Sequence, residues 1–563
     1  MTEELWDAIV VGAGAGGGMS AYVLAQAGLR VLLLEAGRDY KPERETPMFD
    51  LPEKAPLFGA STPDKPFGYY DATVGGGWDV PGEPYTLAPG SAFRWYRARM
   101  LGGRTNHWGR ISLRMGPYDF NGRSRDGHGA DWPISYDDLA PWYDRVEKLI
   151  GLCGGQEDLE NAPSSPSAQP APPMRPYEYL IKRALDGMNI PTAAIRSAIL
   201  TQPLGDRPAC LYATYCYRGC SIRANFQSTT VLLPPAVATG NLEIRTNSFV
   251  HKVLVGQEGR ATGVAIIDRK TGQRYTARAK AVVLAASACE SARILLNSRD
   301  ARHPAGLANE SGQVGRNLMD SVIAYGVAQV PALEGLPPRN DDGISSAHIY
   351  APWWGHAQQT RGELDFPRGY HIDVSGGRFM PAMAFAGIVD ICDAPHGREL
   401  REEMRRKFGT IITFSGNGEM LPNDDCYCDL DPTVTDDWGV PVPRFHWKWG
   451  DSEIRQASHM RKTFLEIMRR LGGNVLVGGD TDGVKAITRG GEAIHETGTT
   501  RMGRSPRDSV VNAHGQTWSV DNLFVMDGGV FASSSDKNPT LTILALSWRS
   551  SDYLVRKFKA GEL

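Results

Sequence analysis

Ala8-Ile9-Val10-Val11-Gly12-Ala13-Gly14-Ala15-Gly16-Gly17-Gly18 is the stretch near the N-terminus that decides the fold. Its first four residues predict a buried β-strand, and its glycines predict a tight turn. The apolar stretch from about Met19 to Ala27 predicts a helix, and residues 31–34 predict a second strand that ends at Glu35. The order strand, turn, helix, strand is typical of a dinucleotide-binding unit.

The glycines of this turn have the spacing Gly12-x-Gly14-x-x-Gly17, and Glu35 lies just beyond the second strand. Glycines let the backbone approach a pyrophosphate, and the helix N-terminus offers unpaired N–H groups to it. Glu35 is suited to accept hydrogen bonds from the adenosine ribose. A glycine-rich turn without a ligand is the alternative interpretation. The motif alone does not choose between NAD and FAD, but its place at the start of the chain is more typical of flavoproteins.

The composition is that of an ordinary globular protein. Charged residues make up 22% of the 563 residues, and 61 basic against 64 acidic side chains give a net charge of −3. This balance gives no reason to expect nucleic acid or an anionic membrane surface as a partner. No apolar run is long enough to span a bilayer. The N-terminus carries no signal, so we expect a cytoplasmic location; export to the periplasm with a partner that carries the signal is the alternative.

A chain of this length predicts more than one domain. We expect an α/β fold in which residues 1–330 and 490–563 form a discontinuous, Rossmann-like FAD-binding domain. Within it, residues 40–90 form an excursion over the surface, and residues 150–205 form a loop or flap. Residues 331–489 contain longer alternating and aromatic segments, which predict a second, α+β domain with an antiparallel sheet.

Three blocks near the C-terminus resemble the signatures of one family. They are His495-Glu-Thr-Gly-Thr-Thr-Arg-Met-Gly503, Val520-Asp-Asn-Leu-Phe-Val-Met-Asp-Gly-Gly-Val530 and Asn538-Pro-Thr-Leu-Thr542. Residues 102–109 and 314–318 look like further signatures. In this order and spacing, the segments are similar to those of the glucose–methanol–choline (GMC) oxidoreductases. The resemblance implies a bound FAD and a substrate domain over the face of the flavin.

The resemblance also implies roles for single residues. Gly12, Gly14, Gly17 and Glu35 would hold the ADP part of FAD. Around the rest of the cofactor it implies Gly103, Asn106 and His107 beside the flavin, Val250 by the adenine, Asp527 and Gly528 by the ribityl chain and pyrophosphate, and Thr540 in the helix beneath the flavin. The Thr-Asn-His-Trp segment around His107 is similar to one in pyranose 2-oxidases, which implies a covalent link from His107 to the flavin. The two residues before the histidine differ from that pattern.

Oxidation of an alcohol through a flavin requires loss of the hydroxyl proton and transfer of the carbon-bound hydride. A histidine is suited to accept that proton, and a neighbouring amide can bind the same oxygen. His495 and Asn538 match the family's version of this pair, so we predict that they are the catalytic residues. Asn538 precedes a proline, and capping of the following helix is a second role open to it.

Three of the eight cysteines, Cys210, Cys216 and Cys220, lie within one short segment. Three thiolates on a loop suit an iron–sulfur cluster, because iron prefers soft sulfur ligands. The spacing resembles that of FAD-dependent glucose and fructose dehydrogenases. This implies a [3Fe–4S] cluster that passes single electrons to a partner such as a cytochrome c, and it suggests a small export or chaperone subunit. A zinc site that lacks one ligand and ordinary buried cysteines are the alternatives.

The residues that follow the Gly-Gly-Arg segment at 102–104 look most like those of bacterial glucoside 3-dehydrogenases. The resemblance implies oxidation of a secondary hydroxyl, at C3, of a pyranose sugar or glycoside. Trp95, Trp353 and Trp354 are candidates to stack on a sugar face. Glu419 is the candidate carboxylate for a sugar hydroxyl. Two alternatives stay open: an oxidase that reduces oxygen to hydrogen peroxide, and a non-catalytic flavoprotein subunit.

Overall fold

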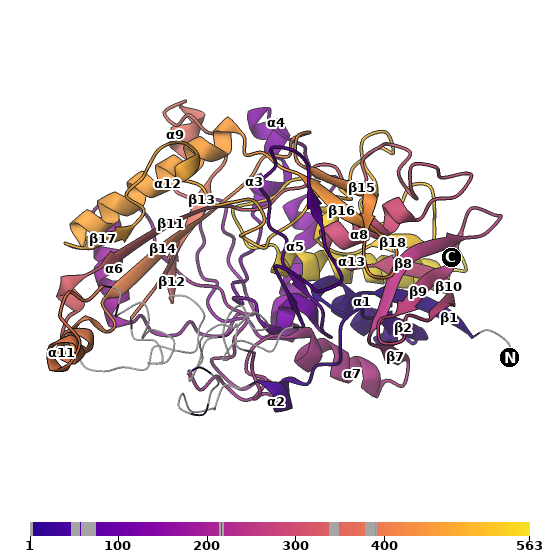
Figure 1. Cartoon of the computed structure of the whole chain (residues 1–563), viewed down its shortest axis with the longest axis horizontal. Coiled ribbons are helices and arrows are strands. Elements are labelled where there is room, and N and C mark those ends of the chain that lie inside the picture. The colour runs from indigo at the N-terminus through magenta and orange to yellow at the C-terminus, as the bar shows by residue number, and fades with distance from the viewer. Residues whose placement is uncertain are drawn as a thin grey trace.

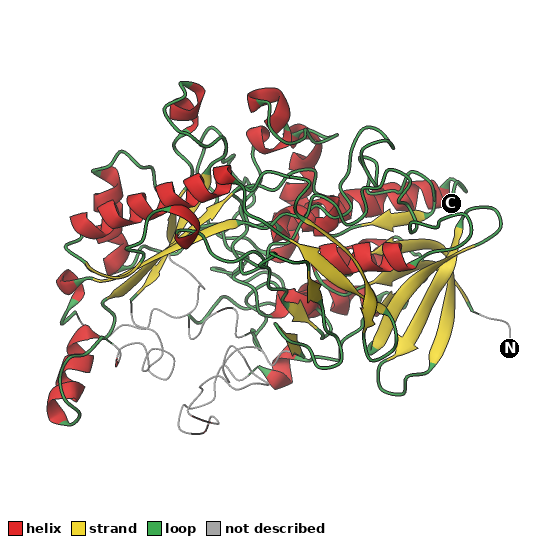
Figure 2. Ribbon diagram, turned by 45° about the horizontal axis from the view of Figure 1, so that its top comes forward, coloured by secondary structure: helices red, strands yellow, loops and turns green. Residues whose placement is uncertain are grey.

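The computed structural model describes residues 4–46, 54, 57, 75–212, 216, 219–336, 348–377, 389 and 391–563. Figures 1 and 2 show two sheets at opposite ends of the molecule, with helices and long loops between them. One is a seven-stranded sheet, and the other is a six-stranded sheet. The predicted fold class, an α/β dinucleotide-binding domain with a second antiparallel α+β domain, is confirmed.

The seven-stranded sheet contains the predicted dinucleotide-binding unit. Its parallel strands lie in the order β7 (Leu242–Arg245), β2 (Val31–Leu34), β1 (Leu5–Val11), β10 (Arg274–Leu284) and β18 (Leu523–Val525). The first half of β10 continues into an antiparallel extension with β9 (Ala261–Asp268) and β8 (Ser248–Val255). Strand β2 is buried along its whole length, as expected for a parallel strand covered on both faces.

Helices from both ends of the chain cover this sheet. Helix α1 (Ala15–Gln26) packs against α13 (Thr540–Lys559), which also contacts α5 (Tyr136–Ile150). Helix α1 begins four residues before the predicted helix start near Met19, because the glycines of the turn form its first turn. A Cβ on Gly16 would lie 1.8 Å from the carbonyl oxygen of Met526, so only glycine permits this close approach.

The six-stranded sheet is antiparallel, and α12 (Asp451–Arg470) packs on it. Its order is β17 (Asn474–Val477), β11 (Val322–Gln329), β14 (Ile411–Gly418), β13 (Tyr370–Gly376), β12 (Ile349–Ala351) and β6 (Ala193–Ala194). Strand β11 precedes the predicted domain boundary at residue 330, yet it pairs with β14 along eight residues. The second sheet therefore begins before the predicted boundary, because the partner of β11 follows much later in the chain.

Two further segments differ from the predicted arrangement. Strands β15 (Tyr427–Thr435) and β16 (Pro441–His446) pair with β4 (Thr86–Leu87) and contact α8 (Ala288–Asn297), so they belong beside the seven-stranded sheet although they fall within 331–489. The predicted flap at 150–205 contains α6 (Pro176–Asp186), which contacts α12.

The remaining elements are short or lie at the periphery. They are α2 (Pro42–Glu45), β3 (Gly76–Gly77), β5 (Arg97–Ala98), the 3₁₀ helix η3 (Gly103–Asn106), α3 (Pro117–Phe120), α4 (Gly122–Asp126), η5 (Ser228–Leu232), α7 (Leu233–Ala238), η6 (Pro331–Leu333), α9 (His356–Thr360), α11 (Arg398–Lys407), η7 (Gly483–Lys485) and η8 (Gly528–Val530). In the part of the chain that the structure describes, no helix is both long and apolar enough to cross a membrane.

Candidate active site

One cavity of about 370 Å³ gathers residues from the whole length of the chain. It lies at the carboxyl ends of β1 and β2, where parallel sheets of this kind bind their ligands. The predicted residues in its wall are Gly12, Gly14, Glu35, Gly103, His107, Val250, His495, Asp527, Gly528, Asn538 and Thr540. Nearly all the residues predicted for the cofactor and the chemistry therefore surround a single space.

The glycine turn between β1 and α1 forms one wall of this cavity. Gly12 has a φ of +95°, which favours glycine. A Cβ on Gly17 would lie 1.9 Å from the carbonyl oxygen of Gly12, so Gly17 is required for the packing of the turn. A Cβ on Gly14 would meet nothing within 4 Å, because Gly14 faces the cavity. The first turn of α1 has no side-chain cap, which leaves its N–H groups for an anionic group.

Glu35 follows β2 and is buried in the cavity wall. Its two carboxylate oxygens accept hydrogen bonds from the N–H of Ala13 at 3.0 Å and of Gly37 at 2.7 Å. Burial raises the pKa of Glu35, and these two hydrogen bonds oppose that rise. The carboxylate thus joins the glycine turn to the end of β2. Together with the open space beside Gly14, this arrangement fits the ADP part of FAD.

The segment around η3 forms the opposite wall. His107 lies in this wall and is half-buried; its Nε2 atom is buried and has no hydrogen-bond partner within the described part of the chain. Burial, with Arg110 and Arg104 nearby, lowers the pKa of His107 to about 3, so the ring is neutral. Asn106, the predicted residue next to His107, is fully buried. Its amide donates to the carbonyl oxygen of Leu101 at 2.8 Å and accepts from Thr229, and the residue is not part of the cavity wall.

Asp527 sits where β18 leads into η8, on the same side of the cavity as Gly528. Its carboxylate accepts a hydrogen bond from the Ser291 hydroxyl at 2.5 Å and one from the Gly529 N–H at 2.8 Å. Burial raises the pKa of Asp527 to about 6, against the effect of the Ser291 hydrogen bond. A carboxylate so placed can accept hydrogen bonds from the hydroxyls of a ribityl chain.

His495 and Asn538 share this cavity, as the sequence predicts. The Nδ1 of His495 forms a hydrogen bond of 2.9 Å with the Ser321 hydroxyl, which precedes β11. A proton held on Nδ1 leaves Nε2 as the atom that can accept one. Burial, Arg104 and His371 lower the pKa of His495 to about 3. The imidazole is therefore neutral at physiological pH, and one of its ring nitrogens has a free lone pair.

Arg104 is a cavity residue that the motif analysis did not single out for a role. Its guanidinium donates to the carbonyl oxygen of Ile494 at 3.0 Å and forms an ion pair of 2.5 Å with Glu496. It thus holds both residues that flank His495 in the chain. The signal in the sequence was its place inside the Gly-Gly-Arg signature.

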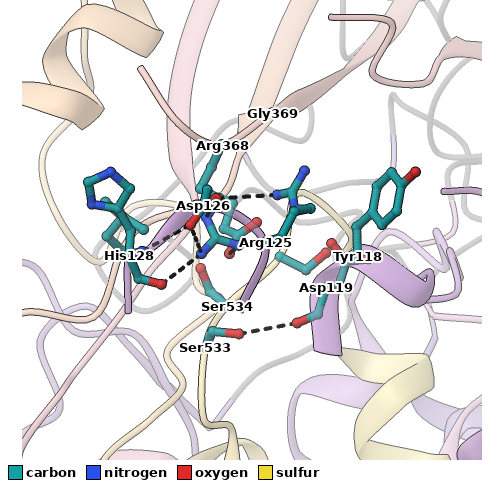
Figure 3. A network of polar contacts seen from close by, with 12 residues as sticks. Tyr118, Asp119, Arg125, Asp126, His128, Arg368, Gly369, Ser533 and Ser534 are labelled. Carbon is teal, nitrogen blue, oxygen red and sulfur yellow. Dashed lines mark hydrogen bonds and ion pairs between the residues drawn. The ribbon is translucent and has the colours of Figure 1, made fainter. Parts of the chain in front are cut away.

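Asn538 lies at the end of a loop that the rest of the molecule holds in place. Its Oδ1 is buried and has no hydrogen-bond partner among the residues described. Two residues earlier, the Asp536 carbonyl accepts a hydrogen bond from His371 of β13. Lys537 forms an ion pair of 3.1 Å with Asp119 of α3, and Figure 3 shows Ser533 beside the same Asp119. The amide is thereby presented to the cavity with its oxygen unpaired.

Glu419 lies outside the cavity wall. It forms an ion pair of 3.4 Å with Arg368, which binds Asp126 of α4 and the carbonyl oxygen of His128 in the network of Figure 3. Burial raises the pKa of Glu419 to about 8, against the effect of Arg368. Its contacts join the second sheet to the segment 117–128, and nothing in them indicates a sugar hydroxyl.

A second cavity of about 220 Å³ adjoins the loop that ends at Asn538. Asp536 and Lys537 lie in its wall, together with Trp353 and Trp354. Trp353 is buried and packs on Tyr370, whereas Trp354 is only half-buried. Trp95, the third candidate for sugar stacking, is buried among aromatic rings and lines neither cavity.

The three clustered cysteines lie behind the wall that contains His107. Arg110 donates to the carbonyl oxygens of Cys216, Thr105 and Asn106 and so joins the two segments. Burial raises the pKa of the Cys216 thiol; Arg110 opposes that rise and the other two thiols add to it. Among the described residues, these cysteines included, no three His, Cys, Asp or Glu side chains are arranged to hold a metal ion.

Comparison with known proteins points to the same family as the sequence motifs. Residues 7–323 and 422–547 match the two sequence profiles of the GMC oxidoreductases. The 2-methyl-1,2-propanediol dehydrogenase of Mycolicibacterium austroafricanum is 32% identical to this chain. The alignment covers 98% of this chain and 95% of that dehydrogenase. The fructose dehydrogenase large subunit of Gluconobacter japonicus is 28% identical, and the alignment covers 99% of this chain and 98% of that subunit. The formate oxidase structure of Aspergillus oryzae, determined in a study of FAD modification, aligns over 100% of both chains with a TM-score of 0.65 and 16% identity, which shows a shared fold.

Proposed function

We propose that this chain, which belongs to the GMC oxidoreductase family, oxidises a secondary hydroxyl of a pyranose sugar or glycoside, with C3 favoured. Members of the family oxidise alcohol and sugar hydroxyl groups with a bound flavin. When bound, FAD supplies the acceptor for the hydride of the substrate carbon. The observation that carries the proposal is the meeting of His495 and Asn538 in the cavity that contains Gly14 and Glu35.

The residues of the chain have distinct tasks in this proposal. His495 accepts the hydroxyl proton on Nε2 in the tautomer whose Nδ1–H donates to the Ser321 hydroxyl, and its ring is neutral. Asn538 binds the same hydroxyl oxygen with its amide group. The ion pair of Lys537 with Asp119 and the hydrogen bond of His371 to Asp536 keep that amide in place before substrate arrives.

The second cavity supports a sugar as the substrate. Its cationic side chains are each paired with an acid: Arg114 with Glu147, Arg196 with Glu157, and Lys537 with Asp119. A wall with balanced charges favours a neutral ligand that forms many hydrogen bonds over an ion. The half-buried ring of Trp354 offers a face for the C–H groups of a sugar ring. The diol and sugar activities in the names of the two relatives both involve neutral polyols.

The test is anaerobic reduction of the bound flavin by a panel of glucosides, free sugars and a small diol. We expect glucosides to bleach the flavin and His495→Gln to slow this by about 10²–10⁴-fold, the usual contribution of a general base. His514 is a matched control, because it is also partly buried with a lowered pKa but stacks on Tyr553 outside the cavity. Undiminished reduction in His495→Gln would remove this histidine from the mechanism.

The choice between a sugar and a small diol rests on Trp354. Trp354→Ala should raise the KM for the preferred glucoside about tenfold while leaving the reaction with the small diol unchanged, since a diol does not reach the second cavity. Trp142→Ala is the control, because that ring packs on Arg145 of α5. An equal rise in KM for the glucoside and for the diol would argue against a sugar as the substrate.

We also propose an iron–sulfur cluster on Cys210, Cys216 and Cys220, with a one-electron acceptor such as a cytochrome. Two of the sulfurs already accept backbone hydrogen bonds of 3.3 Å, from Tyr212 and Ala224, a feature that tunes such clusters. The absence of a metal-ligand arrangement among the described residues stands against it. Iron analysis of anaerobically purified protein tests the cluster: iron bound to the protein would support it, and protein without iron would exclude it. Stoichiometric hydrogen peroxide in air would favour the oxidase instead.

A covalent bond between His107 and the flavin completes the proposal. The ring is neutral, lies in the cavity wall and has an unpaired Nε2, as alkylation of that nitrogen requires. Acid denaturation of the wild-type protein should leave the yellow flavin attached to the chain, and His107→Ala should release it. A flavin that the wild type releases would exclude the link.

A further inference from the structure

The residue before His495 has a backbone conformation that its side chain disfavours. Ile494 has a φ of +59°, in the left-handed region that a β-branched residue adopts only under constraint. Strain of this kind persists where surrounding contacts over-determine the backbone. The contacts of the loop 491–496 therefore determine where the His495 ring lies.

A single buried carboxylate makes most of these contacts. Asp320 accepts hydrogen bonds from the N–H groups of Gly491 at 2.8 Å, Ala493 at 3.3 Å and His495 at 2.9 Å. It is 1% exposed and immediately precedes Ser321, whose hydroxyl binds the His495 ring. Two consecutive residues thus fix the backbone and the imidazole of the same histidine.

The segment that carries Asp320 is itself anchored to the far side of the loop. Met319 and Thr497 exchange backbone hydrogen bonds of 2.9 and 3.0 Å. Arg104 holds the Ile494 carbonyl from the opposite direction. The loop is therefore clamped at its N–H groups by an anion and at its strained residue by a cation.

We propose that Asp320 is the positioning residue of the active site: its ionised carboxylate holds the strained loop 491–495 so that the His495 ring faces the substrate hydroxyl. A carboxylate presents only acceptors to the three N–H groups. A protonated carboxyl turns one oxygen into a donor, which faces an N–H and weakens the clamp. The inference rests on the role proposed for His495.

The surroundings of Asp320 set the pH at which the clamp weakens. The charged or titratable groups that face it are Glu496 and His495 on the loop, Arg104 on η3 and Tyr325 on β11. Burial and the negative charge of Glu496 raise the pKa of Asp320 to about 7. The pKa of His495 lies far below this value. The acid limb of the pH–rate profile should therefore belong to Asp320, although His495 is the base.

Rapid anaerobic reduction of the flavin, measured from pH 5 to 9, tests this inference. The wild-type rate should fall on the acid side with an apparent pKa near 7. Asp320→Asn should slow reduction about 10²-fold, as expected for a misplaced reacting group. It should also lose the acid limb while keeping bound FAD. Ser321→Ala should slow reduction but keep the acid limb of the pH–rate profile, because the hydrogen bonds from the loop to Asp320 remain.

Glu178→Gln is the matched control. Glu178 is also buried and accepts backbone N–H bonds, from Arg175 at 2.7 Å and His348 at 2.6 Å, but it lies on α6 away from the cavity. Glu178→Gln should keep the wild-type rate of flavin reduction and the acid limb of its pH profile. A wild-type profile that is flat down to pH 5, or an Asp320→Asn profile equal to the wild type, would overturn the inference. If His495→Gln reduces flavin normally, the proposed function fails first, and the two failures are thereby separated.

Discussion

Two glycines of the first turn differ in what surrounds their missing side chains. A Cβ on Gly17 would collide with the carbonyl oxygen of Gly12, whereas a Cβ on Gly14 would project into the large cavity without meeting protein atoms. The N-terminal turn therefore contains one glycine that is needed for the fold and one that leaves room for a ligand. Their substitution separates folding from cofactor binding.

At this scale we predict that Gly14→Ala folds normally but binds FAD at least about tenfold more weakly, a loss of ~1.4 kcal/mol. Its φ of −68° suits alanine, so only the cofactor meets the added methyl. Gly17→Ala should be destabilised by about 1–3 kcal/mol through overpacking, with or without FAD. Urea unfolding of apoprotein and fluorescence titration with FAD, both in a His107→Ala background so that the cofactor is removable, measure the two effects. Equal losses of stability in both variants would contradict the prediction.

The sequence predicted residues of one cavity where those residues lie inside short, contiguous motifs. Glu35 was predicted from its spacing after the glycine turn, and His495 and Asn538 from motifs that resemble those of the family; all three lie in the wall of that cavity, and their roles stay predictions. Asp320 was missed as a functional residue, because its importance comes from hydrogen bonds to a loop that follows much later in the chain. Asn106 lies outside the cavity wall between two residues that line it, because the motif does not reveal which way a side chain turns.

A buried ion network joins three elements that are distant in the sequence. Glu83, in the segment before β4, forms ion pairs with Arg99 at 2.7 Å and with Arg269 after β9. Arg99 also pairs with Glu290 of α8. The network attaches the early surface segment to the face of the molecule that carries α8 and β15–β16. Nothing in the composition of these segments predicts the pairing.

We predict that Glu83→Gln lowers the free energy of unfolding by about 3–5 kcal/mol, because it leaves buried arginines without their partner. Burial opposes it, but Arg99 lowers the pKa of Glu83 to about 2, below its ordinary value of 4.5. Since the folded pKa is depressed, the stabilisation is present above about pH 4.5 and is lost as the pH falls toward 2.

Urea unfolding of both proteins between pH 3 and 7 checks this prediction. The difference between wild type and Glu83→Gln should shrink as the solution becomes more acidic. Glu466→Gln is the control, because its pairs with Arg469 and Arg470 lie on the surface and should contribute little. A difference that stays constant with pH would show that Glu83 acts through packing alone.

At the scale of the molecule, the large cavity is the place where otherwise separate parts of the chain meet. Its wall draws on β1, β2, η3, β8 and α13, so a ligand there contacts both ends of the sequence. The membership of β6 and β11 in the second sheet could not be read from the sequence, because their partners β12 and β14 follow after many intervening residues.

We predict that removal of FAD lowers the melting temperature strongly, because a ligand that binds only the folded state adds RT ln(1 + [L]/Kd) to its stability. A concentration of FAD 1,000 times its Kd adds about 4 kcal/mol. Differential scanning fluorimetry of the His107→Ala variant, from which FAD can be removed, compares the holoprotein, the apoprotein and the reconstituted protein and measures the shift. Identical melting of the holo- and apoprotein would show that the cavity walls are held by protein contacts alone.

The packing of α1 against α13 has a consequence for the making of the protein on the ribosome. The first helix of the dinucleotide-binding sheet is synthesised early, but its partner helix and Asn538 follow the whole of the six-stranded sheet. During synthesis, the face of α1 that later packs against α13 therefore stays uncovered until the segments of the second sheet have been made. A chain that stops before residue 538 lacks part of the cavity wall.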